Sequence, residues 1–192
     1  GDMTSDENIP PPVIDNKDSL IEAIKASGVV GLGGAGFPTY AKFATDKKIE
    51  YLVVNGAECE PYITSDAYTM LNRADDIAYA IDALVKYCNI EKVVIGVEKN
   101  KPEAIKKMQE IASKGSNISV CTLPSRYPQG GEKVLVYSTT GRIIGAGKLP
   151  IDVGCVVSNC TTLATLGSFF KTGMPLVEKC ITVDGSAVKA PR

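Results

Sequence analysis

The chain has 192 residues, enough for one α/β domain that buries about 70% of the surface of its unfolded form. The 21 basic and 22 acidic residues nearly cancel and form no basic cluster, which excludes the electrostatic footprint of a nucleic-acid-binding protein. No apolar run reaches the ~20 residues that a membrane-spanning helix needs, so we expect no direct insertion into a membrane.

Histidine and cysteine usage narrows the chemistry. Histidine is absent, which excludes Ser-His or Cys-His catalysis and histidine-ligated zinc. The six cysteines show no C-x-x-C spacing, so the sequence predicts no metal site, and reduced core thiols are expected. The remaining candidates for a chemical role are carboxylates, lysines and a bound cofactor. Of these, a redox cofactor needs no protein acid that titrates near neutrality.

The chain is expected to hold one domain. Residues 1–8 are polar, lack the basic segment of a signal peptide and look like an expression scar, with Met3 behind Gly1 and Asp2. Residues 9–188 show no repeat or low-complexity stretch, which predicts a single folded unit. Residues 189–192 are expected to be the truncated start of a further segment.

Two helices are predicted in the first part of the domain. Ser19-Leu20-Ile21-Glu22 is typical of a capping box that opens a helix. This helix is expected to end near Ser27, because Gly28 terminates helices well. After a glycine-rich loop, Pro38-Thr39 favours the start of a short second helix that reaches about Phe43.

Short, continuous apolar runs further along the chain predict strands that are buried on both faces of a sheet. The predicted strands cover 51–54, 93–97, 118–122, 155–157 and 179–183. The predicted helices cover 64–73, 75–88, 102–114, 132–139 and about 161–171. Thr161 or Thr162 is expected to cap the last helix, and the glycine-rich residues 141–150 favour a hairpin.

Strands that alternate with helices indicate a three-layer α/β/α fold with a mostly parallel sheet. In such folds, ligands bind outside the C-terminal ends of the strands. The loops at 55–61 and 158–162 follow predicted strands, so we expect the functional site there.

The glycine loop, Gly31-Leu32-Gly33-Gly34-Ala35-Gly36, matches the G-x-G-x-x-G pattern of Rossmann dinucleotide sites. The context argues against that interpretation, because a Rossmann loop follows a buried strand and this one follows a helix. In a Rossmann site, an acidic residue at the end of the second strand hydrogen-bonds to the ribose. Here the second apolar run of the sequence ends in Asn55 instead.

The glycine loop nevertheless has the properties of a ligand site. Four glycines let the backbone approach a flat or anionic ligand, and their N–H groups can form an anion-binding concavity. A helix that begins near Thr39 adds partial positive charge, Lys42 could reach a phosphate, and Phe37 offers an aromatic face. The alternative is a glycine-rich turn that binds nothing.

Four motifs resemble, in order, the flavin segments of the NADH- and FMN-binding subunit of respiratory complex I. They are the glycine loop with its Phe-Pro-Thr and Lys42, then residues 55–61 (NGAECEP), 130–132 (GGE) and 158–163 (SNCTTL). The strings GLGGAGFPT, NGAECEPYIT, YPQGGEK and LPIDVGCVVSN resemble still more closely the C subunit of the Rnf electron-transport complex. This resemblance covers essentially all of residues 13–188.

The resemblance implies a domain of the complex I flavin-subunit type, with noncovalent FMN as cofactor and NADH as electron donor. It implies that the flavin phosphate and ribityl chain are held by Gly31, Gly33, Gly34, Ala35, Gly36 and Lys42. It implies hydrogen bonds to the ribityl chain or ring from Asn55, Glu58, Ser158, Asn159 and Thr162. It implies NADH contacts for Phe37, Glu60, Glu132 and Lys133.

The chain departs from complex I at two positions. Leu32 replaces an arginine in the loop, and Lys133 replaces the second glutamate of Gly-Glu-Glu, which opens the question of how NADH sits. The resemblance also implies a cysteine-rich region with two 4Fe-4S clusters in the full-length protein, a region outside this chain.

Some of these residues have plainer interpretations. Glu58 and Glu60 can form a solvated loop face, although Asn55 and Pro61 beside them favour a ligand role. Cys59 has no histidine to act as its base, so a structural role is expected. Tyr127 can stack on an adenine or simply pack.

The leading hypothesis is an NADH-dependent flavoprotein oxidoreductase domain of an Rnf-type NADH:ferredoxin oxidoreductase, without full turnover in isolation. It implies other subunits as partners and a cytoplasmic, peripheral place on the inner face of a bacterial cell membrane. The alternatives are the core of a cobalamin reductase of the propanediol-utilisation type, a flavin-free assembly module and a Rossmann dehydrogenase.

Overall fold

The computed structural model describes residues 9–34, 36–58, 60–115 and 117–188. Its centre is a four-stranded sheet with the strand order β3-β2-β1-β4, in which every pair of neighbours is parallel. The strands are β1 (Tyr51–Gly56), β2 (Lys92–Glu98), β3 (Ile118–Leu123) and β4 (Cys155–Asn159). The predicted parallel sheet is confirmed.

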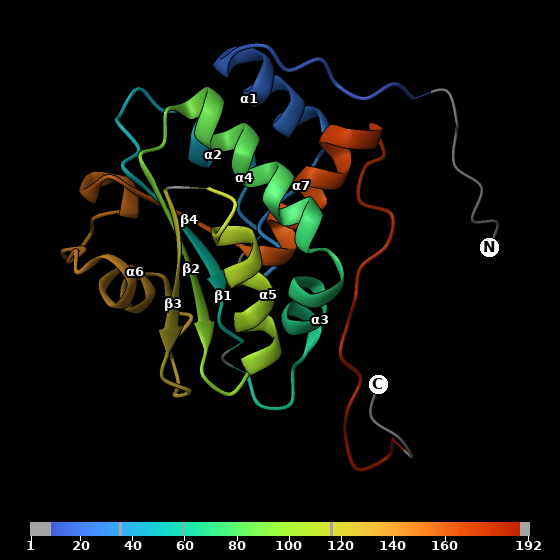
Figure 1. Cartoon of the computed structure of the whole chain (residues 1–192), viewed down its shortest axis with the longest axis vertical. Coiled ribbons are helices and arrows are strands. Elements are labelled where there is room, and N and C mark those ends of the chain that lie inside the picture. Colours follow the sequence, from blue (N-terminus) through green and yellow to red (C-terminus); the bar gives the residue numbers. More distant parts are fainter. Residues whose placement is uncertain (1–8, 35, 59, 116, 189–192) are drawn as a thin grey trace.

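Helices cover both faces of the sheet, so the fold has three layers (Figure 1). Among the described residues the helices are α1 (Lys17–Ala26), α2 (Thr39–Phe43), α3 (Ser65–Asn72), α4 (Ala74–Cys88), α5 (Pro102–Ala112), α6 (Glu132–Thr140) and α7 (Cys160–Thr172), with a 3-10 helix, η1 (Pro150–Val153). The first five and α7 lie on one side of the sheet, and α6 lies on the other (Figure 1).

Strands β1, β2 and β4 are largely buried on both faces because successive residues enter different cores. Val54 and Ile95 pack in the larger core with α1, α4, α5 and α7. Val53 and Val157 pack in the smaller core with Leu135 of α6. This explains the continuous apolar runs of these three strands, whereas the edge strand β3 is only partly buried and includes polar residues.

The two longest helices, α4 and α7, lie side by side on the larger core (Figure 1). Gly167 of α7 allows this close packing, since a Cβ atom there would lie 1.9 Å from the carbonyl oxygen of Asp76 in α4. The absence of a side chain at this position therefore sets the distance between the two helices.

Two predicted helix starts are wrong in detail. Helix α1 begins at Lys17 with Asn16 as its N-cap, so Ser19 is the third helical residue rather than the cap. The box is closed by Asn16 Oδ1, which accepts from the Ser19 N–H, and by Ser19 Oγ, which accepts from the Asn16 N–H. A serine at the third position replaces the expected Glu or Gln. Helix α7 is capped by Asn159 rather than by a threonine.

Two further predictions in the C-terminal half are wrong. Residues 179–183 form no strand, because they run past α3 and the glycine loop instead of along a sheet edge: Thr182 Oγ1 accepts from the Thr64 N–H, and Lys179 Nζ donates to the Leu32 carbonyl. Residues 141–149 form no hairpin, since Gly141 ends α6 with φ of 74° and the chain then enters η1 at Pro150.

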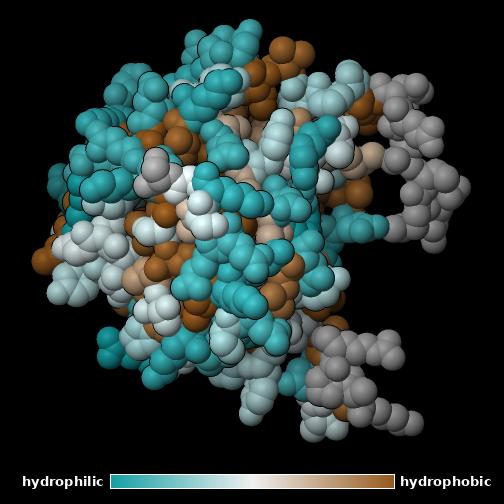
Figure 2. All heavy atoms as spheres, in the orientation of Figure 1, coloured by the Kyte–Doolittle hydropathy of each residue, from teal (hydrophilic) through white to brown (hydrophobic). Residues whose placement is uncertain are grey.

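None of the helices in the described part of the chain is long and apolar enough to cross a membrane. On the face seen in Figure 2, hydrophobic residues are interleaved with hydrophilic ones.

Candidate functional site

The candidate site lies where the strand order changes direction. From β1 the chain proceeds to β2 and β3 on one side, whereas β4 pairs with the other side of β1. The space outside the carboxyl ends of β1 and β4, referred to below as the crevice, is therefore the expected ligand position in a parallel sheet. Asn55 and Asn159 are partners in the register of these two strands, so two of the predicted motifs meet here.

The glycine loop is closed at its base by backbone hydrogen bonds. The Gly31 N–H donates to the Phe37 carbonyl at 2.8 Å, and the Thr39 N–H donates to the Val29 carbonyl at 3.2 Å. Gly36 has φ of 68°, a conformation that other L-residues rarely adopt. These contacts fix the two ends of the loop between α1 and α2.

The glycine loop rests on the N-terminus of α7. The Leu32 N–H donates to Thr162 Oγ1 at 3.0 Å. A Cβ atom at Gly33 would lie 2.7 Å from Asn159 Nδ2, so only glycine allows this approach. The loop backbone and the positive end of the α7 dipole therefore share one side of the crevice, which favours an anionic ligand.

Lys42 reaches the same edge of the sheet. Its Nζ donates to the Val157 carbonyl at 2.8 Å and lies 3.6 Å from a carboxylate oxygen of Glu132. A phosphate here would gain a cation next to the loop, as the sequence predicts.

One buried hydroxyl at the end of the loop is unsatisfied. Thr39 is 1% exposed, and its Oγ1 has no hydrogen-bond partner within the part of the chain that the structure describes. A buried polar atom of this kind is costly unless another group satisfies it. It is therefore a group that a bound ligand or water would stabilise.

The segment before α6 is attached to β1. Asn55 Nδ2 donates to the Gly130 carbonyl at 3.1 Å, and Asn55 Oδ1 accepts from the Ala57 N–H. This brings the Gly130-Gly131-Glu132 motif to the carboxyl end of β1. All four predicted motifs therefore gather at one edge of the sheet.

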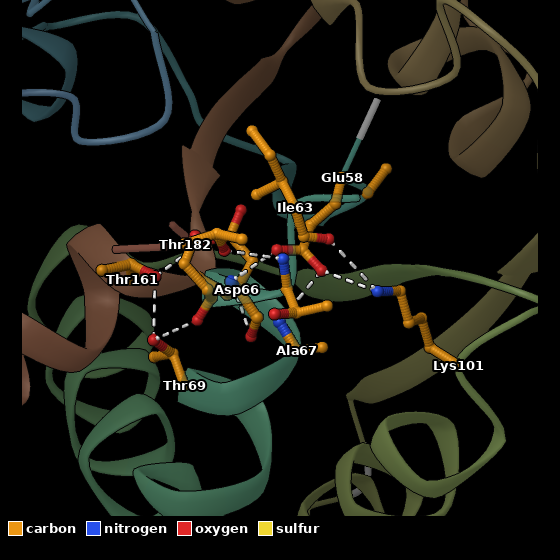
Figure 3. Close-up of polar contacts among 12 residues, drawn as sticks. Glu58, Ile63, Asp66, Ala67, Thr69, Lys101, Thr161 and Thr182 are labelled. Atoms are coloured by element: carbon orange, nitrogen blue, oxygen red, sulfur yellow. Dashed lines mark hydrogen bonds and ion pairs between the residues drawn. The ribbon is translucent and has the colours of Figure 1, made fainter. Parts of the chain in front are cut away.

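The Glu58 side chain points toward the start of α3 (Figure 3). Its two oxygens accept from the N–H groups of Asp66 and Ala67 and lie beside Lys101 Nζ, at 3.0 Å from the nearer oxygen. The side chain is only 2% exposed. Glu58 thus caps α3 and pairs with a half-buried lysine, an arrangement that sequence reasoning did not anticipate.

Glu98 lies beside this pair at the end of β2 and is 4% exposed. Burial raises the pKa of its carboxyl, while the nearby Lys101 acts in the opposite direction. The Glu58 N–H donates to it. A buried carboxyl of this kind favours its neutral form.

The remaining predicted residues differ in exposure. Phe37 is 52% exposed and Glu60 is exposed, so both are accessible to a large ligand. Ser158 is buried in β4. Lys133 is turned toward the loop after α6, where its Nζ donates to the Gly145 carbonyl. Ala35 lies outside the described residues, as does Cys59.

Sequence reasoning missed the residue that connects these motifs, Asp66. Its carboxylate accepts from Asn159 Nδ2 at 2.8 Å and from Thr161 Oγ1 at 2.6 Å. The available signal was its position in the first turn of a predicted helix that follows the second motif. Within the described residues no cluster of His, Cys, Asp and Glu side chains is suited to a metal ion.

A parallel α/β domain with a glycine loop on a helix N-terminus at the switch point of its sheet belongs to the class of nucleotide-cofactor-binding domains. The family model described as the Nuo51 FMN-binding domain matches residues 24–168. The chain belongs to this family.

Similar proteins are much longer than this chain. It is 41% identical over 175 residues to the C subunit of the proton-translocating ferredoxin:NAD(+) oxidoreductase complex of Clostridium ljungdahlii, covering 90% of this chain and 38% of that protein. It is 44% identical over 176 residues to the C subunit of the ion-translocating oxidoreductase complex of Pseudomonas aeruginosa, covering 90% of this chain and 22% of that protein.

The fold also occurs in a solved structure, an NAD+-reducing [NiFe]-hydrogenase in the air-oxidized state. The TM-score is 0.68 at 21% sequence identity, over 88% of this chain and 33% of the hydrogenase chain. This match confirms the three-layer fold.

Proposed function

We propose that the chain binds FMN noncovalently at this crevice and that the bound flavin accepts electrons from NADH. The observation that carries the proposal is the close contact between the glycine loop and the start of α7, where Gly33 packs against Asn159 with no room for a Cβ atom. Membership of the FMN-binding family supports it.

The residues present fit a flavin phosphate. The Leu32 N–H donates to Thr162 and the Gly31 N–H to the Phe37 carbonyl, so the loop donors for a dianion would be the N–H groups of the glycines that follow Leu32. The positive end of α7 and Lys42 supply positive charge. The unsatisfied Thr39 hydroxyl lies next to the loop. The edge of the crevice carries amide side chains, Asn55 and Asn159, which suit the hydroxyl groups of a ribityl chain.

We assign the phosphate and ribityl chain to the loop and Lys42, and hydrogen bonds to the ribityl chain or ring to the polar residues that end β1 and β4. The first group is Gly31, Gly33, Gly34, Ala35, Gly36 and Lys42, and the second is Asn55, Ser158, Asn159 and Thr162. Because the oxygens of Glu58 are engaged with α3 and Lys101, its part in this proposal is to hold the second motif in place.

NADH is assigned to the outer side of the crevice. The exposed ring of Phe37 can stack on it, and Glu60 and Glu132 can accept hydrogen bonds from it. Lys133 is the less direct candidate, because its Nζ is occupied by the Gly145 carbonyl. When bound, FMN would supply the ability to take up a hydride and release electrons singly to iron–sulfur clusters elsewhere in the full-length protein.

The proposed setting is an ion-translocating electron-transport complex of the Rnf type, at the inner face of the cell membrane. The names of the relatives support this setting, since they describe the C subunit of such complexes. The chain spans 38% or less of these two relatives, so complete turnover is assigned to the longer protein and its partner subunits.

Anaerobic titration with FMN and then with NADH tests the proposal. We expect FMN to bind and the absorbance of the oxidised flavin to be lost when NADH is added. Lys42→Met should weaken FMN binding about tenfold to a hundredfold by removing a charged partner of the phosphate. It should leave the weaker binding of riboflavin, which has no phosphate, nearly unchanged.

Lys106→Met is the matched control, because Lys106 is an exposed residue of α5, away from the loop. FMN binding without bleaching by NADH would remove the electron-donor part of the proposal. No binding of FMN at micromolar concentration would instead favour a flavin-free assembly module.

A further inference from the structure

Asp66 connects three segments that are distant in the sequence. It lies in the first turn of α3, and its N–H donates to Glu58 Oε1 at 2.7 Å. Its carboxylate accepts from Asn159 Nδ2 and Thr161 Oγ1, at the start of α7 (Figure 3). The second and fourth predicted motifs are therefore joined through this one residue.

The contacts of Asp66 fix which way the amide of Asn159 faces. Asn159 Oδ1 accepts from the N–H groups of Thr161 and Thr162, as an N-cap does. An ionised carboxylate only accepts, so Asp66 must face the NH2 end of the amide. A rotation of the amide by half a turn would place a donor against the helix N–H groups and an oxygen against the carboxylate.

The orientation of this amide matters because the glycine loop rests on it. Asn159 Nδ2 is the atom nearest to where a Cβ of Gly33 would lie, at 2.7 Å. Thr162 also supports the loop, because its Oγ1 accepts a hydrogen bond from the Leu32 N–H. Asp66 accepts from one hydrogen of Nδ2 and is its only acceptor within the described residues, which leaves the second hydrogen available to a ligand.

We infer that Asp66 is a positioning residue of the cofactor site and acts through Asn159. It keeps the Asn159 amide turned so that the glycine loop can seat and Nδ2 can donate to the bound cofactor. The inference rests on the proposed function, since the cofactor is FMN.

Asp66→Asn is the sharpest test, because it preserves size and shape but removes the acceptor-only character of the side chain. We expect FMN to bind about tenfold more weakly, measured by quenching of flavin fluorescence. Thr161→Val is a milder variant that removes the second donor to the carboxylate, and it should weaken binding about twofold to fivefold. Asp75→Asn, an exposed acid in the first turn of α4, is the control and should bind like the wild type.

A double-mutant cycle with Asn159→Ala separates positioning from general destabilisation. If Asp66 acts through Asn159, the Asp66→Asn change should have almost no further effect on FMN affinity once Asn159 is alanine. Thermal unfolding of each apo-protein should still register both changes separately.

The outcomes are distinguishable. Suppose that the wild-type protein binds FMN. If the Asp66→Asn variant then binds FMN with equal affinity, or if the losses in the cycle are additive, the inference is overturned and the proposed function still stands. Wild-type protein that does not bind FMN overturns both. Should Asp66→Asn fail to fold, the Thr161→Val variant decides by the same criterion.

Discussion

At the residue scale, the site depends on polar groups whose partners come from distant parts of the chain. Glu58, which the sequence suggests as a ligand group, directs its oxygens to α3 and Lys101. Beside it, burial raises the pKa of Glu98, so the fold favours the neutral form of this carboxyl. Glu98 therefore makes the stability of the carboxyl end of β2 depend on pH.

Glu98→Gln should reduce this pH dependence. A carboxyl whose pKa is raised by folding contributes stability below its ordinary pKa and loses that contribution as the pH rises through the raised value. Wild-type protein should therefore lose unfolding free energy relative to the Gln variant as the pH rises above the ordinary pKa of a glutamate, as measured by urea unfolding. Glu178→Gln, an exposed acid in the C-terminal segment, should follow the wild-type curve, and identical curves for all three proteins would contradict the prediction.

At the element scale, the parts of the fold that could be predicted are those that local pattern determines. Strands β1, β2 and β4 contain short apolar runs because both of their faces are buried, as Val53 and Val54 show for β1, and this pattern is visible in the sequence. Residues 179–183 have a similar composition but no sheet edge beside them, and only tertiary structure reveals this. The caps of α1 and α7 could not be predicted either. Ser, Thr and Asn residues lie close together at both helix starts, and their capping propensities are too similar to distinguish them.

The motifs of the site were predictable as a set, but their internal geometry was not. Four segments in a fixed order at strand ends are a sequence property, and the structure brings them to one edge of the sheet. The direction of the Glu58 side chain and the role of Asp66 depend on the position of α3 relative to α7. No spacing in the sequence encodes that arrangement.

Gly167→Ala should strongly destabilise the α4–α7 pair. The added Cβ would overlap the Asp76 carbonyl oxygen, 1.9 Å away, and backbone cannot yield as a flexible side chain can. We expect a loss of about 3 kcal/mol or more of unfolding free energy in urea. Ser168→Ala, the adjacent change on the same helix, should cost less than about 1 kcal/mol. Equal stability of the two variants would mean that the helices are not in this close contact.

At the scale of the whole molecule, the pKa values of buried thiols indicate how well the larger core excludes water. Burial raises the pKa of Cys88 to about 11 and that of Cys160 well above its ordinary range. Cys180 is partly exposed in the C-terminal segment. The described cysteines are free; Cys88, Cys155 and Cys160 are buried, as expected for core thiols, whereas Cys121, like Cys180, is only partly buried.

Alkylation of the native protein should follow this division. Iodoacetamide at about pH 8 should modify Cys180 and spare Cys88 and Cys160, because only the thiolate of an accessible cysteine reacts. Peptide mass spectrometry before and after unfolding in guanidinium chloride measures the difference. Native-state modification of Cys160 at the rate of Cys180 would show that the start of α7 opens readily.

The seat of the glycine loop has a consequence for how the protein is made. Leu32 and Thr162, which it joins, are 130 positions apart in the chain, and β1 obtains its second neighbour only when β4 exists. During synthesis, the loop therefore emerges from the ribosome long before the helix that supports it. Contacts over such a separation form slowly, since a long loop must close first. With FMN bound at this site as proposed, we expect cofactor capture to be a late event that a nascent chain ending before α7 does not perform.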